Sequence, residues 1–318
     1  MASGPAPALR VLILGAAAGG GFPQWNSNAP GCRRARSGDP AAKPRTQSSI
    51  AVSCDGDRWV LFNASPDLRA QVEASPPLHP RHGVRSSPIA AVVVTNGDVD
   101  HVAGLLTLRE GTPFALYGTA AVHATLAANP MFRVLQADVV PRRPLPVGDR
   151  VALEDAAGTP IGLEVRAFPV PGKVPLYRET ETADLAIGAE TDDVVGLEIR
   201  ADATPERRLH YVPGCARVTP GLKARLAGSP LLLFDGSFWR DDEMAQAGAG
   251  TKTAARMGHI PMGGGDGSIA ALAGLELGRR IFVHINNTNP VLLADTEERA
   301  AVVDAGWEVA EDGMEIVL

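Results

Sequence analysis

The residues best suited to chemistry stand together where a β-branched run, residues 92–95, stops at a turn. The turn carries two carboxylates and one imidazole, from Asp98, Asp100 and His101. Such a run is typical of a buried strand, and carboxylates and imidazoles are common metal ligands. The stretch therefore predicts a strand that delivers metal-binding groups at its end. The alternative is that Asp98 and Asp100 only cap a helix that starts near Val102, a role that acidic residues often fill.

Alternating apolar runs and turns predict the strands and helices that must position this turn. Asp55-Gly56 joins two apolar runs and is a strong hairpin signal. Between residues 150 and 210 the apolar runs recur with one short interruption, which indicates a second sheet rather than a second domain. The predicted strands are 11–14, 48–53, 58–63, 89–95, 114–117, 151–153, 161–168, 185–187, 194–199, 209–212, 231–234 and 281–284, and the predicted helices are 103–109, 120–127 and 266–277. Residues 308–309 and 315–317 are predicted to form a closing hairpin.

Length and composition describe a globular chain and exclude several classes of partner. The 318 residues are 45% hydrophobic, which suits a well-buried core, and the net charge is −6. No basic run is long enough to follow a phosphate backbone, so we expect no nucleic-acid partner. No segment suits a signal peptide or a membrane span, so we expect a cytoplasmic protein. Three widely spaced cysteines without a C-x-x-C pair predict no disulfide framework.

A glycine-rich segment, residues 15–21, follows the first predicted strand. It lacks the G-x-G-x-x-G spacing of a dinucleotide site and the Gly-Lys-Ser/Thr of a P-loop. We therefore interpret it as a tight turn where backbones approach closely.

The 95–101 stretch resembles the signature of the metallo-β-lactamase superfamily, in which a strand ends in Thr-His-x-His-x-Asp-His. Thr95, Asp100 and His101 match, whereas Asn96 and Asp98 replace the first two histidines. The resemblance implies an α/β (α+β) fold, a four-layer αββα sandwich of two mixed β-sheets flanked by helices. It also implies one domain over residues 1–318, with residues 1–8 as a loose N-terminal tail.

In that superfamily the first histidines bind one metal and the Asp-His pair binds a second. The third histidine of the first site would fall at residues 168–175, and the bridging aspartate at residues 212–215, but neither residue is present. His284 at a predicted strand end matches the last ligand of the second site. The resemblance therefore leaves Asp100, His101 and His284 as the metal ligands.

One carboxylate and two imidazoles with open coordination positions are typical of non-haem Fe(II) sites that activate dioxygen. We therefore expect Fe(II), although the same set also suits a catalytic Zn²⁺ with bound water. Candidates for base, orientation or substrate contact are Asp98, Asp235, His259, Cys215 and Asn287, of which Asp98, His259 and Asp235 are the predicted catalytic residues. For His259 and Asp235 a purely structural role is equally open. His210 is predicted to be a satisfied core or edge residue.

Six motifs together resemble the branch of the superfamily that acts in pyrroloquinoline quinone (PQQ) biosynthesis. They lie at residues 17–26, 45–52, 63–67, 96–101, 257–262 and 284–290. Many members of that branch bind a structural zinc through Cys-x-Cys-x-x-Cys, but here the positions are Ser27, Ala29 and Cys32. One thiolate cannot close a tetrahedral zinc site, so we predict that this zinc is absent and that packing holds the loop.

The resemblance implies Fe(II)- and O₂-dependent hydroxylation of the tyrosine ring of a glutamate–tyrosine precursor. The expected partners are this small, dipeptide-like precursor, O₂ and other PQQ-biosynthesis proteins, without nucleic acid or membrane. A carrier of PQQ or its precursor, without catalysis, is the alternative. A hydrolase of phosphodiester or lactone bonds is the weakest hypothesis, because Asn96, Asp98 and Gly172 replace the histidines it needs.

Overall fold

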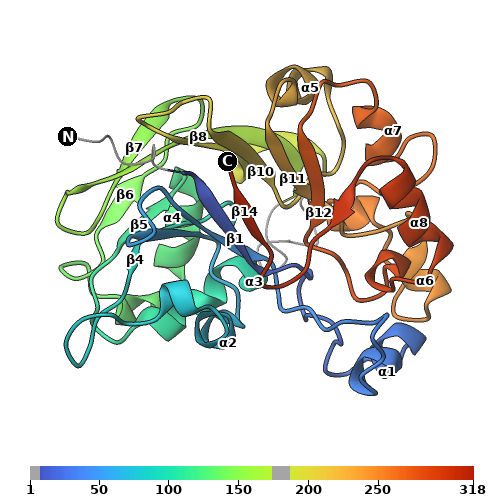
Figure 1. The fold of residues 1–318 in the computed structure, drawn as a ribbon, viewed down its shortest axis with the longest axis horizontal. Helices are drawn as coiled ribbons and strands as arrows, with labels where there is room; N and C mark the ends of the chain where they lie inside the picture. Colours follow the sequence, from blue (N-terminus) through green and yellow to red (C-terminus); the bar gives the residue numbers. More distant parts are fainter. Residues whose placement is uncertain (1–7, 174–186) are drawn as a thin grey trace, which may run out of the picture.

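Two β-sheets pack face to face, and helices cover the outer face of each (Figure 1). The computed structural model describes residues 8–173 and 187–318. Within those residues each sheet has seven strands. This arrangement confirms the predicted four-layer αββα sandwich.

The first sheet has the strand order β14-β1-β2-β3-β4-β5-β6. Strands β14, β1, β2 and β3 pair antiparallel, whereas β3, β4, β5 and β6 pair parallel. The hairpin predicted about Asp55-Gly56 is confirmed as β2 and β3. The strands are β1 (Arg10–Gly15), β2 (Ser49–Ser53), β3 (Trp59–Phe62), β4 (Ile89–Val93), β5 (Ala115–Gly118), β6 (Arg142–Pro144) and β14 (Glu315–Val317).

The second sheet has the order β13-β12-β11-β10-β9-β8-β7 and is likewise half parallel and half antiparallel. The recurring runs between residues 150 and 210 therefore do build a second sheet, as predicted. The strands are β7 (Arg150–Glu154), β8 (Pro160–Gly172), β9 (Ala189–Ala201), β10 (Arg208–Val212), β11 (Leu231–Asp235), β12 (Arg279–Val283) and β13 (Glu308–Val309). Except for its last residue, the strand predicted at 185–187 lies outside the described residues.

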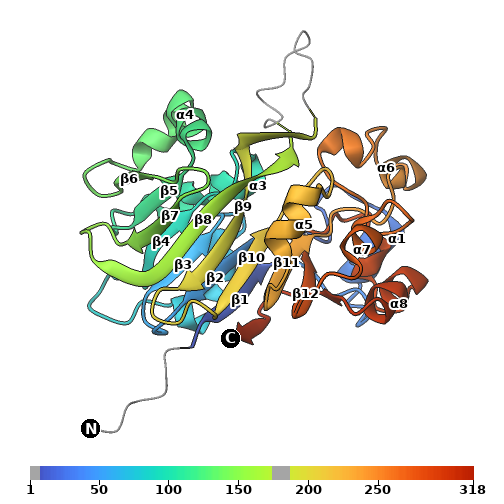
Figure 2. The ribbon, with the colours of Figure 1, turned by 90° about the horizontal axis from the view of Figure 1, so that it is seen from above.

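The helices are short. They are α1 (Pro30–Arg36), α2 (Leu68–Glu73), α3 (Val99–Val102), α4 (Ala120–Ala128), α5 (Pro220–Leu226), α6 (Glu243–Gln246), α7 (Ser268–Leu272) and α8 (Glu297–Asp304). Of these, α2, α4, α5, α7 and α8 each bury apolar side chains against a sheet. Single 3₁₀ turns are η1 (Pro76–Leu78), η2 (Ala103–Leu108), η3 (Pro130–Val134), η5 (Ala255–Met257) and η6 (Pro290–Leu292). In Figure 2 helices α5, α7 and α8 lie beside β10–β12, whereas α4 lies on the side of β4–β6.

Three apolar clusters hold the four layers together. The largest fills the space between the sheets, where residues such as Ile13, Val93, Leu197 and Leu233 are fully buried. A second cluster joins α5, α7 and α8 to the outer face of the second sheet, and a third joins α2 and α4 to the outer face of the first. Burial of apolar surface on both faces of both sheets explains why many strands read as continuous apolar runs.

Three sequence predictions of local structure were wrong. Residues 308–309 and 315–317 do not form a hairpin, because β13 pairs with β12 in the second sheet and β14 pairs with β1 in the first. Asp312 fixes the crossing between them, since its carboxylate accepts the backbone N–H groups of Ala16 and Thr46. The segment predicted as a helix at 103–109 is the 3₁₀ turn η2, and the helix predicted to reach residue 277 ends at Leu272.

Parallel strands place their carboxyl ends at one edge of a sheet, and both sheets use that edge for polar residues. Strand β4 leads into Thr95 and helix α3, while β11 and β12 end at Asp235 and just before His284. Functional groups from distant parts of the chain therefore meet at the edge shared by the two parallel halves. Among the described residues no helix combines the length and the apolar character needed to cross a lipid bilayer.

We expect the core between the sheets to set the stability of the fold. Leu233 on β11 is fully buried in that core, so Leu233→Ala should lower the free energy of unfolding by about 2–5 kcal/mol. The exposed Val303 of α8 offers a control, and Val303→Ala should change it by less than about 0.5 kcal/mol. Urea denaturation followed by circular dichroism measures both; an equal loss in the two variants would contradict this account.

Candidate metal centre

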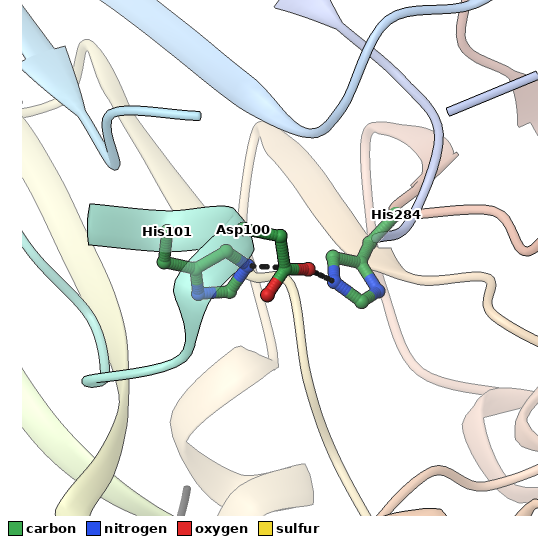
Figure 3. Close-up of side chains that lie close together, drawn as sticks. All are labelled: Asp100, His101 and His284. Carbon is green, nitrogen blue, oxygen red and sulfur yellow. Dashed lines mark hydrogen bonds and ion pairs between the residues drawn. The ribbon is translucent and has the colours of Figure 1, made fainter. Parts of the chain in front are cut away.

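Asp100, His101 and His284 meet at the shared edge of the sheets, although 184 residues separate Asp100 from His284 (Figure 3). Asp100 Oδ2 lies 3.1 Å from His284 Nε2 and 3.9 Å from His101 Nε2. One ligand atom from each residue lies within 4.8 Å of the other two. The structure therefore brings together the three residues predicted as metal ligands.

A hydrogen-bond chain fixes the tautomer of His101. The Thr95 hydroxyl uses its only hydrogen to donate a hydrogen bond to Asn63 Oδ1 (3.1 Å), so in its contact with His101 Nδ1 (3.4 Å) Thr95 Oγ1 is the acceptor and the ring nitrogen the donor. The lone pair of the neutral ring is then on Nε2, which is buried and has no hydrogen-bond partner. Burying an imidazole nitrogen without a hydrogen-bond partner costs free energy. The neutral imidazole with a free lone pair is the form of histidine that binds metals.

A matching chain orients His284 from the other sheet. Ser237 Oγ donates to Asp235 Oδ1 (2.7 Å) and accepts from His284 Nδ1 (2.9 Å), so His284 Nε2 faces Asp100. The backbone of His284 has φ 57°, in the left-handed region. That conformation is costly for a residue other than glycine and is frequent at functional sites.

Charge and burial shift the pKa values of these groups. Burial alone raises the pKa of Asp100, but the charges of His101 and His284 and the His284 hydrogen bond hold it well below its usual range. Burial opposes a charge on His284, yet the hydrogen bond to Asp100 and the charges of Asp100, Asp235 and Asp98 together outweigh it and raise the pKa of His284. Burial lowers the pKa of His101 to about 4. The carboxylate of Asp100 therefore favours a proton on His284, while burial favours the neutral form of His101.

Asp235, His259 and His284 form a second close group of possible ligands. Asp235 is fully buried, and both of its oxygens are already occupied. Oδ2 accepts from His259 Nδ1 (2.7 Å) and the backbone of Cys215 (2.9 Å), while Oδ1 accepts from the hydroxyl and backbone N–H of Ser237. This carboxylate therefore orients two histidines and has little capacity left for a metal.

A cavity of about 330 Å³ opens over both histidine groups. Asp98, Asp100 and the three histidines supply its polar floor, and Lys173, Lys252 and Arg256 supply cationic groups. Burial and the charge of Asp100 raise the pKa of Asp98. The cations of the 252–256 segment, together with Ser237 and Asn286, were not identified from the sequence, because no local pattern sets them apart from ordinary surface polar residues.

The residues of this site fit a metal ion. His101 Nε2 has a lone pair and no partner, and two neighbouring ligand atoms lie 3.1 Å apart. Metal–ligand bonds of about 2.1 Å at right angles separate two ligand atoms by about 3.0 Å. A Cβ added at Gly19 would lie 3.4 Å from Asp100 Oδ2, so the glycine-rich turn keeps this space open.

The other predicted positions line the same cavity or are sequence neighbours of residues that line it. Asn96 and Gly172, which stand where the superfamily has histidines, both line it. Asp98 occupies the N-cap position of α3, but its side chain makes no capping hydrogen bond. Cys215 contributes its backbone N–H to Asp235, whereas its buried thiol lies 3.1 Å from the Arg217 carbonyl. Asn287 donates to Gln24 Oε1 and connects the site to the 24–28 loop.

Comparison with known proteins decides the family. The sequence model described as beta-lactamase superfamily domain matches residues 58–285. "Coenzyme PQQ synthesis protein B" of Methylorubrum extorquens AM1 is 57% identical over 310 residues, which cover 98% of this chain and 100% of that protein. The protein of the same name from Gluconacetobacter diazotrophicus is 55% identical over 306 residues and 96% of this chain. The chain belongs to the coenzyme PQQ synthesis protein B family.

A solved structure of a family member supports the assignment. The crystal structure of Zn²⁺-bound PqqB from Methylobacterium extorquens has a TM-score of 0.91 and 57% identity, covering 97% of this chain and all of that one. A diphosphatase of the PhnP family, with a TM-score of 0.66 and 19% identity, shares the fold alone. Membership of the PQQ synthesis protein B family, one member of which was solved with Zn²⁺ bound, fits a metal-dependent role for this site.

Arginines hold the 24–28 loop, which precedes the Cys32 position where the sequence predicts no structural zinc. Arg36 donates to the carbonyl oxygens of Ser27 (2.5 Å) and Gln24, and Arg33 donates to that of Asn28 (2.8 Å). The loop is therefore held by charged hydrogen bonds and not by packing alone. The absence of a structural zinc at Cys32 stays a prediction.

A buried carboxylate supports the wall of the cavity. Glu243 on α6 accepts the Thr288 hydroxyl (2.6 Å) and the Trp239 backbone N–H (2.7 Å), and Thr288 Oγ1 accepts from the amide of Asn286 (2.6 Å). Asn286 lines the cavity. Burial raises the pKa of Glu243 to about 7 despite these hydrogen bonds.

We expect Glu243 to make stability depend on pH. Its pKa rises from 4.5 to about 7 on folding, so the folded state binds the extra proton between these values. Protonation of Glu243 adds about 3 kcal/mol to the free energy of unfolding below pH 4.5, and this stabilisation is lost as the pH rises through 7. Glu243→Gln mimics the protonated form, so this variant should gain stability relative to wild type between pH 5 and pH 8.

Urea denaturation at both pH values measures this difference. Glu276→Gln, at an exposed glutamate, is the control, and it should gain no stability relative to wild type between pH 5 and pH 8. If the stability of Glu243→Gln ran parallel to that of wild type across this range, the assignment of the proton to Glu243 would be wrong.

Proposed function

We propose that this protein is a metal-dependent hydroxylase of PQQ biosynthesis, which uses Fe(II), O₂ and two electrons from a reductant to hydroxylate the tyrosine ring of a glutamate–tyrosine precursor, while the second oxygen atom leaves as water. The observation that carries the proposal is the buried, unpartnered Nε2 of His101 beside Asp100 and His284. Asp100, His101 and His284 would hold the metal. When bound, Fe(II) supplies the activation of dioxygen.

The composition of the ligand set supports oxidation over hydrolysis. Hydrolytic centres of two metals need additional imidazoles and a bridging carboxylate. Asn96, Asp98 and Gly172 replace the three imidazoles, and Gly214 lies near the position expected for the bridging carboxylate. One carboxylate and two imidazoles leave coordination positions open for dioxygen and substrate.

His259 is suited to move a proton at the site. Its Nδ1 donates to Asp235 Oδ2, so its Nε2 carries the lone pair, and its ring lines the cavity stacked on His284 with centroids 5.3 Å apart. We assign His259 Nε2 the role of base toward the phenol, with Asp235 holding the ring in this tautomer. Asp98, which lines the same cavity, would contact the substrate.

The remaining walls suit an aromatic substrate that carries carboxylates. Val99, Val194, Phe238 and Met257 give the cavity an apolar side, against which a tyrosine ring can pack. Lys252 and Arg256 line the same cavity, where they can pair with the carboxylates of a glutamate–tyrosine unit. The cavity therefore matches the charge and the ring of this precursor.

The decisive experiment loads the protein with Fe(II) without oxygen and then adds a glutamate–tyrosine substrate, a reductant and O₂. Mass analysis should show a gain of one oxygen atom with Fe(II) and none with Zn²⁺. His101→Ala should lose at least about 100-fold of this activity, because a metal ligand is removed. Its iron content after desalting should fall in parallel.

Binding of substrate or PQQ in one-to-one ratio, without turnover under any metal, would instead establish the carrier. Full activity of a metal-free His284→Ala variant would remove the metal from the mechanism.

The cationic wall yields a separate prediction. Lys252→Glu places a repelling charge where a substrate carboxylate should bind, so KM should rise by about tenfold while kcat changes little, since uniform binding is lost. Lys223→Glu makes the same charge change on α5 and should leave KM unchanged. Steady-state kinetics over a range of salt concentrations tests this pair, and an unchanged KM for Lys252→Glu would exclude this lysine from substrate binding.

A further inference from the structure

The outer face of the second sheet carries a cationic cavity that the proposed function does not use. Cross-strand register builds it in two rows. The first row runs from Arg150 on β7 through Arg166 and Glu198 to His210 on β10; the second runs through Glu164, Arg200 and Arg208. Arg225 from α5 closes one side, with its guanidinium 4.9 Å from the centre of the Phe168 ring.

These rows place like charges directly opposite each other. Arg150 pairs with Arg166, and Arg200 pairs with Arg208. Like charges at such positions destabilise a sheet. Four arginines and two glutamates line the cavity, which leaves two positive charges in excess in a chain whose net charge is −6; they are Arg150, Arg200, Arg208, Arg225, Glu198 and Glu206.

The glutamates compensate only part of this charge. Glu198 pairs with Arg150 (2.7 Å), and Glu164 pairs with Arg200. Arg208 donates to the Gly228 carbonyl oxygen (2.9 Å), which is a neutral acceptor. The cavity has a volume of about 400 Å³, so an anion has both the room and the uncompensated charge to bind.

His210 lies at the base of this cavity and is only 2% exposed. The Ser229 hydroxyl donates its proton to the Leu231 carbonyl (2.8 Å), so Ser229 Oγ accepts from His210 Nδ1 (2.8 Å). The lone pair is therefore on Nε2, which is buried without a partner. The prediction that His210 is a satisfied residue is wrong for this nitrogen. The register places Glu198 opposite His210, the carboxylate of Glu198 pairs with Arg150, and no described N–H or O–H group lies within hydrogen-bond distance of Nε2. Burial lowers the pKa of His210 to about 4, so the ring is neutral near pH 7.

We propose that this cavity is a binding site for inorganic hydrogen phosphate, held by Arg208 and Arg225 and by an O–H···N bond to His210 Nε2. Guanidinium groups bind phosphate oxygens through paired, charge-assisted hydrogen bonds. The lone pair of His210 requires a donor, and a hydrogen phosphate ion carries an O–H as well as acceptor oxygens. The site would thus satisfy the buried nitrogen and relieve the repulsion between Arg200 and Arg208.

The same chemistry distinguishes hydrogen phosphate from other oxyanions. Sulfate has no O–H near neutral pH. A phosphomonoester has lost its second proton above its pKa of about 6, so it resembles sulfate in this respect. Binding of the free ion and binding of a phosphorylated metabolite are therefore separable.

Isothermal titration calorimetry of the full chain at pH 7.5 with phosphate, sulfate and glycerol 3-phosphate tests the proposal. Phosphate should bind at least about tenfold more tightly than the other two, the factor expected for one hydrogen bond. The ring ¹⁵N signal of His210 Nε2 should shift on addition of phosphate alone.

Arg225→Ala should weaken phosphate binding by at least about tenfold, and Arg208→Gln provides a second variant should the first be poorly folded. Lys223→Ala removes the same charge from the same helix outside the cavity and should stay within about twofold. Three results would overturn the proposal: no binding of phosphate, equal binding of sulfate, or phosphate binding that survives Arg225→Ala and Arg208→Gln. The last result would place the ion elsewhere, for instance at the metal centre.

Discussion

The contact between Asp100 and His284 is the interaction on which the candidate metal centre depends. Asp100 follows the first sheet and His284 follows the second, so their 3.1 Å separation exists only while the two sheets keep their register. The apolar core between the sheets provides that register. The geometry of the site therefore depends on the packing of the two sheets, because a shift of either sheet would separate the Asp100 carboxylate from the His284 imidazole.

Each sheet also prepares its histidine in the same way. Thr95 Oγ1 accepts a hydrogen bond from His101 Nδ1 and donates one to Asn63. Ser237 Oγ accepts a hydrogen bond from His284 Nδ1 and donates one to Asp235. In both cases a hydroxyl between a ring and a fixed acceptor binds Nδ1 and directs Nε2 toward the centre. Asn63 and His284 both have positive φ values, so the backbone conformations that hold these chains are costly ones that the packed core must support.

Electrostatics divides the second sheet into two distinct surfaces. At its carboxyl edge, acids and histidines form a floor for a cation, and lysine and arginine stand at the wall of the same cavity. On its outer face, arginines outnumber acids around a histidine with a free lone pair. Each site contains a buried imidazole whose tautomer is set by a serine or threonine hydroxyl. The surrounding charges favour a cation at the metal centre and an anion at the cavity on the outer face.

The sequence by itself determined the local pieces of this protein. The apolar run before Asp100 and His101, the hairpin signal at Asp55-Gly56 and the strand end at His284 are encoded by neighbouring residues, and the motifs identified the family. Only the tertiary structure decided which sheet residues 315–317 join, that Ser237 orients His284, and that His210 lacks a partner beneath the arginines. Propensity and periodicity act over a few residues, whereas strand order and register set contacts across hundreds of residues and decide which nitrogen of a histidine carries its proton.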